Sequence, residues 1–63
     1  MADLFPISLD DQIDELSREL RLRQRVYPRF VQSGSLSQTK SARQIAVLEA
    51  AIESLHRLKG LET

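Results

Sequence analysis

The residues of this sequence that are capable of acid–base or metal chemistry are few. The single histidine, His56, is close along the chain to Glu49 and Glu53, a pattern that is typical of a charged helix surface. There is no cysteine, so the chain offers no thiolate nucleophile and no thiolate metal ligand. Two glycines do not make a phosphate-binding loop. We expect no catalytic residue, no cofactor, no metal site and no enzyme activity.

Four acidic residues cluster near the start of the chain: Asp10, Asp11, Asp14 and Glu15. Carboxylates of this kind are ligands for hard cations such as Ca²⁺. They also follow Ser8 directly, and serine is a preferred helix N-cap residue. Acidic side chains in the first turns of a helix are stabilised by its dipole. We therefore interpret the cluster as the beginning of a helix.

A line of arginines is the pattern with the most functional content. Arg18, Arg21, Arg25 and Arg29 recur at intervals of 3, 4 and 4 residues, so they share one face of a helix. The arginine fork matches carboxylate and phosphate groups. The line predicts contact with an acidic protein surface or with nucleic acid, and the alternative is a solvated face.

Charge is distributed unevenly along the chain. No acidic residue lies between Leu20 and Leu48, and this stretch also contains Lys40 and Arg43, whereas residues 1–19 hold six acidic residues against Arg18 alone. A third interpretation is therefore self-association, in which the basic end of one molecule meets the acidic end of another. A formal net charge of zero favours protein binding over nucleic-acid binding, because DNA-binding domains are usually basic overall.

The apolar residues predict a first helix over residues 9–32. Their spacing of three, four and seven residues is typical of one helical stripe, made of Leu9, Ile13, Leu16, Leu20, Tyr27 and Val31. Pro28 interrupts the pattern, and we expect a kink there, with a break at Tyr27 as the alternative. We expect the first helix to end at Gly34, because glycine readily adopts the left-handed backbone angles that follow a helix.

A second helix is predicted over residues 36–59. Its predicted capping box is Ser35-Leu36-Ser37-Gln38. We expect the helix to end at Gly60, with Leu61 folding back onto it. The expected apolar face consists of Ile45, Leu48, Ala51, Ile52, Leu55 and Leu58. Residues 1–7 form an expected N-terminal arm.

The short link makes the two helices antiparallel, so the predicted fold class is an all-α, antiparallel two-helix hairpin. The first helix carries a second apolar set, Leu22, Val26 and Phe30, which we place roughly opposite its main stripe. Chains of 63 residues bury little surface alone and usually need a disulfide, a metal or a partner. We therefore predict a homodimer packed as a four-helix bundle.

The composition is that of a folded protein that stays out of the membrane. Hydrophobic residues make up 41% and charged residues 29% of the chain, and no apolar run reaches the roughly 20 residues of a membrane span. The first residues lack the basic and apolar segments of a signal peptide. We expect a cytoplasmic location.

The segments Glu19-Leu20-Arg21-Leu22-Arg23-Gln24-Arg25-Val26-Tyr27-Pro28 and Ala42-Arg43-Gln44-Ile45-Ala46-Val47-Leu48-Glu49-Ala50 flank Val31, Gly34 and Leu36. This arrangement resembles a family of small uncharacterised helical proteins of bacteriophages and prophages of proteobacteria, over residues 8–58. The resemblance implies a phage protein that acts in the cytoplasm of a host bacterium. It implies no activity, although small phage proteins of this kind often bind a host factor.

The leading functional hypothesis is a phage-encoded module that dimerises and binds, and inhibits or modulates, a host protein. Its predicted partner-binding residues are Arg18, Arg21, Leu22, Arg25, Val26, Tyr27, Arg29, Phe30, Lys40 and Arg43. The alternatives are a nucleic-acid-binding accessory protein that uses the basic end, and a structural or assembly coiled-coil element.

Overall fold

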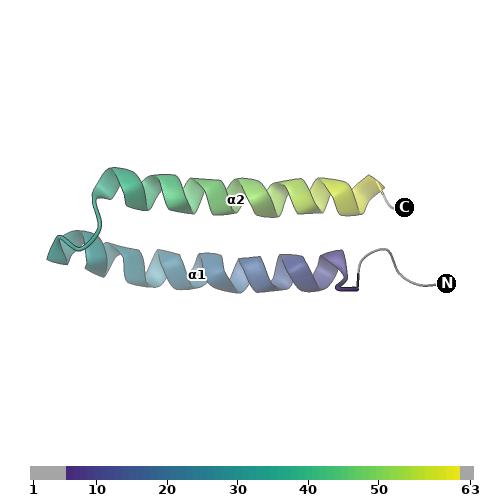
Figure 1. The fold of residues 1–63 in the computed structure, drawn as a ribbon, viewed down its shortest axis with the longest axis horizontal. Helices are drawn as coiled ribbons and strands as arrows, with labels where there is room; N and C mark the ends of the chain where they lie inside the picture. The colour runs from purple at the N-terminus through teal and green to yellow at the C-terminus, as the bar shows by residue number, and fades with distance from the viewer. Residues whose placement is uncertain (1–5, 62–63) are drawn as a thin grey trace.

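The computed structural model describes residues 6–61 and consists of two helices joined by a short link (Figure 1). Helix α1 spans Leu9–Ser33 and helix α2 spans Gln38–Leu61. The two lie side by side and run in opposite directions, which gives an elongated rod (Figure 1). Residues 6–61 contain no strand. The predicted all-helical hairpin is confirmed; most of the predicted arm, residues 1–5, lies outside the described residues.

Helix α1 begins where the sequence predicts. The Ser8 hydroxyl oxygen accepts a hydrogen bond from the backbone N–H of Asp11 at 3.0 Å, and the Ser8 carbonyl accepts one from the N–H of Gln12 at 3.1 Å. The side-chain amide of Gln12 donates to the Ile7 carbonyl at 3.1 Å. These bonds satisfy amide groups that the first turn of a helix otherwise leaves free.

Helix α1 ends on Gly34, as expected. Gly34 has φ 83°, its N–H donates to the Val31 carbonyl at 3.1 Å, and the Ser35 N–H donates to the Phe30 carbonyl at 2.9 Å. This pair of bonds is the Schellman motif. The helix continues through Pro28, so the alternative of a break at Tyr27 is wrong, while the kink stays a prediction.

Helix α2 begins later and ends later than predicted. Its N-cap is Ser37, whose hydroxyl oxygen accepts the Lys40 N–H at 3.1 Å, and not Ser35. The reason is that the N–H groups of Ser35 and Leu36 both donate to the Phe30 carbonyl, which makes them part of the end of α1. The predicted stop at Gly60 is also wrong, because a glycine costs a helix only about 1 kcal/mol.

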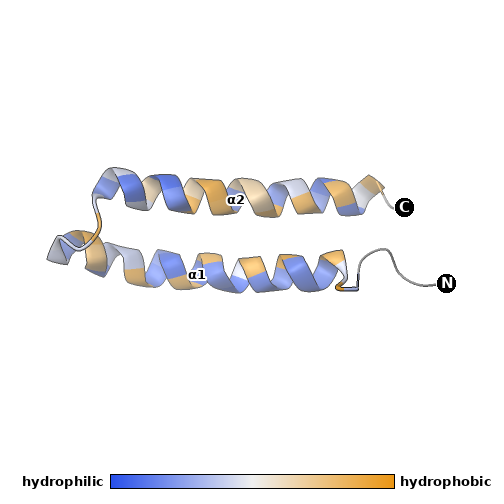
Figure 2. Ribbon diagram, in the orientation of Figure 1, coloured by the Kyte–Doolittle hydropathy of each residue, from blue (hydrophilic) through white to orange (hydrophobic). Residues whose placement is uncertain are grey.

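The core between the helices is a single narrow strip. On α1, Leu9 and Ile13 are buried and the rest of the predicted stripe is half-buried, which confirms it. On α2, Leu48 is buried, but Ala51 and Leu58 of the predicted face are exposed. One neighbouring helix is too narrow to cover the wide apolar face of α2. Figure 2 shows apolar residues recurring along both helices.

The second apolar set of α1, Leu22, Val26 and Phe30, lies on the flank of the hairpin. Leu22 is 40% and Phe30 44% exposed, whereas Val26 is half-buried. Each of the three directly precedes a half-buried residue, namely Arg23, Tyr27 or Val31. One residue is a rotation of about 100°. The predicted position roughly opposite the stripe is therefore wrong, and the set lies about a quarter turn from it.

The two glycines should respond in opposite ways to replacement by alanine. Gly34→Ala is expected to lower the free energy of unfolding by roughly 1 kcal/mol, because its left-handed backbone is costly for a residue with a Cβ. Gly60→Ala, within α2 and with nothing within 4 Å of the added Cβ, should raise it by a few tenths of a kcal/mol or more. Urea unfolding followed by circular dichroism at one protein concentration measures both. Equal effects would contradict the assignment of Gly34 as the helix end.

Candidate protein-binding surface

The outer face of α1 is formed by Arg18, Arg21, Arg25 and Arg29, which are all exposed. Arg25 lies two residues before Tyr27 and Arg29 two residues before Val31, so each is rotated by roughly 160° from a side chain that packs towards α2. Arg18 forms an ion pair with Glu15, one turn earlier. The line of arginines predicted from spacing therefore points away from the rest of the hairpin.

The other two predicted basic contacts, Lys40 and Arg43, do not join this line. Both are exposed on α2 near the link. Arg43 follows the buried Ser41 by two residues, so it lies on the outer side of α2, at the opposite edge of the hairpin from the outer face of α1. The loop end is basic, but its charges are divided between two edges and do not form one patch.

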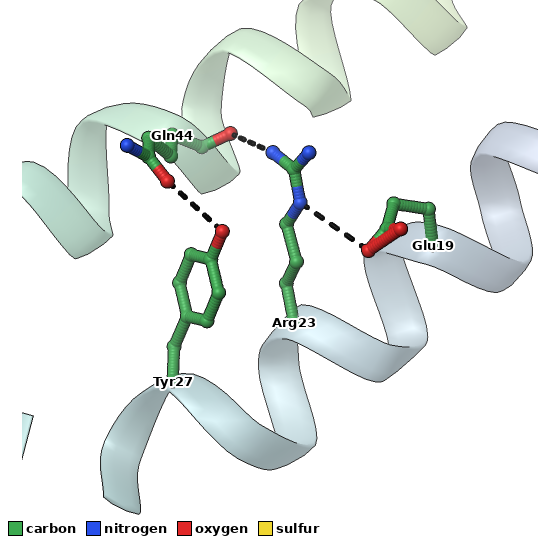
Figure 3. Close-up of polar contacts among 4 residues, drawn as sticks. All are labelled: Glu19, Arg23, Tyr27 and Gln44. Atoms are coloured by element: carbon green, nitrogen blue, oxygen red, sulfur yellow. Dashed lines mark hydrogen bonds and ion pairs between the residues drawn. The ribbon is translucent and has the colours of Figure 1, made fainter. Parts of the chain in front are cut away.

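Tyr27 belongs to the contact between the helices. Its ring is half-buried, and its hydroxyl donates a hydrogen bond to the side-chain Oε1 of Gln44 at 2.9 Å (Figure 3). The Phe30 ring lies 6.2 Å from the Tyr27 ring, centroid to centroid. Of this aromatic pair, only Phe30 presents a large exposed area at 44%. Tyr27 thus packs between the helices beneath Phe30, and Phe30 is the aromatic side chain that is exposed for contact with a partner.

Arg23 is an inward-facing arginine that the sequence analysis did not single out. Its Nη1 donates to the Gln44 backbone carbonyl at 3.2 Å, its Nε lies 3.5 Å from Glu19 Oε2, and its guanidinium lies 5.9 Å from the Tyr27 ring centroid (Figure 3). Its side chain is 28% exposed. A signal was present, because Arg23 fills the gap of seven residues between Leu20 and Tyr27 in the apolar stripe.

The far end of the hairpin carries a second polar link between the helices. Lys59 of α2 forms an ion pair with Asp10 of α1. Both side chains are about half exposed, at 47% and 64%, and pairs of this kind contribute less than about 1 kcal/mol. The Arg57–Glu53 pair lies within α2 at 2.5 Å and is more exposed still. The Lys59–Asp10 pair therefore aligns the helices rather than holding them together, and the Arg57–Glu53 pair joins no two elements.

The described residues line at least two open hollows of the hairpin. One, of about 530 Å³, lies beside the acidic start of α1 and is lined by Ile7, Asp11, Gln12, Asp14, Glu15, Leu16 and Arg18. The other, of about 480 Å³, has Pro28, Val31, Ala42 and Ile45 in its lining, together with three glutamines and Ser41. Within residues 6–61, no three metal-ligating side chains come close enough to hold an ion. Neither hollow gathers a nucleophile and a base.

Comparison with known proteins gives no relative for this chain: no family model, curated protein or solved structure matches it. Neither α1 nor α2 is long and apolar enough to cross a membrane.

Two nearby arginines should differ sharply in their effect on stability. Arg23→Ala is expected to lower the free energy of unfolding by about 1–2 kcal/mol, because it removes a charged donor and a packed stem at the helix contact. Arg25→Ala, on the outer face of α1, should change it by less than about 0.5 kcal/mol. Thermal unfolding at a fixed concentration tests the pair. A larger loss for Arg25→Ala would contradict the inward role of Arg23.

Proposed function

We propose that the chain is a small protein-binding module that dimerises and uses the outer face of α1 to bind an acidic surface on another protein. The observation that carries this proposal is a set of uncompensated charges. Within residues 6–61, Arg21, Arg25 and Arg29 are exposed and have no ion-pair partner, whereas Arg18, Arg23, Arg57 and Lys59 each have one. Three like charges within three helical turns repel one another, so an acidic partner relieves this repulsion.

The spacing of these arginines indicates the kind of partner. Successive residues of the line are one turn apart, and four residues of helix rise about 6 Å. Carboxylates on one face of an acidic helix recur at the same interval, so each can accept a forked arginine contact. Leu22 and Phe30 are exposed next to the arginines and supply apolar area at the edge of the contact. An acidic, amphipathic helix is the partner that this face fits best.

The resemblance to small phage proteins supports a biological setting for this binding. We place the protein in the cytoplasm of a host bacterium, where binding to a host protein inhibits or modulates that protein. The segregation of charge supports this more than it supports nucleic-acid binding, because the chain as a whole has a net charge of zero.

Charge reversal on the outer face tests the proposal. Arg25→Glu is expected to reduce capture of the partner from bacterial lysate at least tenfold, and the addition of Arg29→Glu should abolish it, while helicity is retained. Arg57→Glu is the matched control, since it changes net charge by the same amount as Arg25→Glu but lies on α2. Capture read by quantitative mass spectrometry separates these outcomes. Equal losses in Arg25→Glu and Arg57→Glu would move the binding site elsewhere.

Nucleic-acid binding is the second candidate, and the unpaired arginines are the observation that favours it. Phosphates accept the same forked contacts as carboxylates. If the outer face of α1 binds duplex DNA or RNA, affinity for random duplexes should fall steeply between about 50 and 200 mM salt. A gel shift with no complex at the lower salt concentration would remove this candidate and leave protein binding in place.

A further inference from the structure

The hairpin has one face that is richer in apolar residues than the other. Six apolar residues lie on it, and each directly precedes a residue that packs or bonds between the helices. We call this set the apolar flank: Leu22, Val26 and Phe30 of α1, and Val47, Ala51 and Leu58 of α2. The same rotation on two antiparallel helices leads to the same side of the hairpin. Phe30, Val47 and Leu58 are 44%, 52% and 43% exposed.

The opposite face provides the contrast. It is formed by residues that directly follow the inward-facing ones, and most of these are polar or charged, such as Asp14, Gln24, Glu49 and Glu53. The internal core does not offset this asymmetry. Within the described residues, Leu9, Ile13 and Leu48 are the only buried apolar residues. A hairpin with so thin a core gains stability when the apolar flank is covered.

We propose that the apolar flank is covered by the same flank of a second copy of this chain, with the two hairpins antiparallel. Charge selects this occupant. The loop half of the hairpin, residues 20–48, carries six basic residues and no acidic one. The described terminal segments, residues 6–19 and 49–61, carry seven acidic residues against three basic ones. Two copies in opposite directions place each basic half on an acidic half, whereas two copies in the same direction oppose like charges.

The dimensions of the hairpin support the same occupant. Helices of 24 and 25 residues are about 37 Å long, and two helices side by side are about 20 Å wide. One face is therefore on the order of 700 Å², close to the roughly 800 Å² that each partner buries in a standard interface. The zero net charge adds no overall repulsion between copies.

The contacts between α1 and α2 locate the two-fold axis. Gln44 bonds to Arg23 and Tyr27, and Lys59 pairs with Asp10, so Leu22 and Val47 lie at the same level along the rod. This is the level at which both helices present an exposed apolar residue of the flank. With the axis there, α1 lies on α1 and α2 lies on α2. Val47 then contacts Val47 of the second copy. Arg29 of one copy lies at the same level along the rod as Glu15 of the second copy.

The absence of cysteine makes a direct test possible, because a single introduced cysteine is the only thiol. Val47→Cys is expected to form a disulfide-linked dimer within minutes under mild oxidation at micromolar concentration. Ala46→Cys is the matched control, one residue away and exposed on the polar face, and should form at least tenfold less. Equal or absent cross-linking in Val47→Cys would overturn the proposal. Preferential linkage between Leu22→Cys and Val47→Cys chains would show the parallel arrangement and also overturn it.

Two measurements on the purified chain complete the test. Sedimentation should show a dimer for the natural sequence and for Ala46→Glu, and a helical monomer for Val47→Glu; a monomeric natural sequence would overturn the proposal. The dimer Kd should rise between about 50 and 500 mM NaCl, because screening weakens the opposed charges. A falling Kd would show that like ends meet. The inference rests on the dimer in the proposed function, but no binding partner enters these measurements, so their failure leaves the test of the outer face of α1 intact.

Discussion

The constraint behind this structure is that each helix of a two-helix hairpin has a single neighbour. A helix surrounded by others buries side chains on several sides, but here α1 and α2 cover only the strip that each turns towards the other. The consequence is visible in the exposure of Leu22, Phe30, Val47 and Leu58, which are all large, apolar and at least 40% exposed. Caps at both ends of α1 and at the start of α2 satisfy backbone groups at the helix ends, but they cannot widen the strip.

Polar groups fix how the rods lie along each other. Two apolar stripes with a helical period can shift by one turn along each other, because the next turn offers a similar surface. Such a shift would break a hydrogen bond between the two helices. Gln44 receives bonds from Arg23 and Tyr27 near the link, and Asp10 pairs with Lys59 at the far end. Polar residues inside helical bundles often specify register in this way. Arg23 therefore fixes the register of the two helices, whereas the arginines on the outer face of α1 are exposed and free to contact another molecule.

The sequence predicted the local features well, because they depend on few residues. The cap at Ser8, the left-handed Gly34 and the α1 stripe each follow from a short pattern and are confirmed. The start of α2 was predicted wrongly, because the sequence alone does not distinguish Ser35 from Ser37 as the N-cap residue. The structure does, since the Ser35 N–H donates to the Phe30 carbonyl and so belongs to the end of α1. Arg23 was missed although its spacing fits the apolar stripe, because its bond to the Gln44 carbonyl of the other helix cannot be predicted from that spacing. Lys40 and Arg43 were grouped with the arginine line because they share charge, whereas helical rotation separates them.

The proposed antiparallel dimer and the proposed binding surface on the outer face of α1 are compatible because they use different sides of the same helix. The apolar flank lies about a quarter turn from the interhelical strip, whereas Arg25 and Arg29 are rotated by roughly 160° from the strip. With α1 of one copy lying on α1 of the other, the two outer faces share one edge of the bundle. In this proposal an acidic helix bound at that edge would contact arginines of both copies, and the acidic start of each α1 would lie beside the basic end of the other.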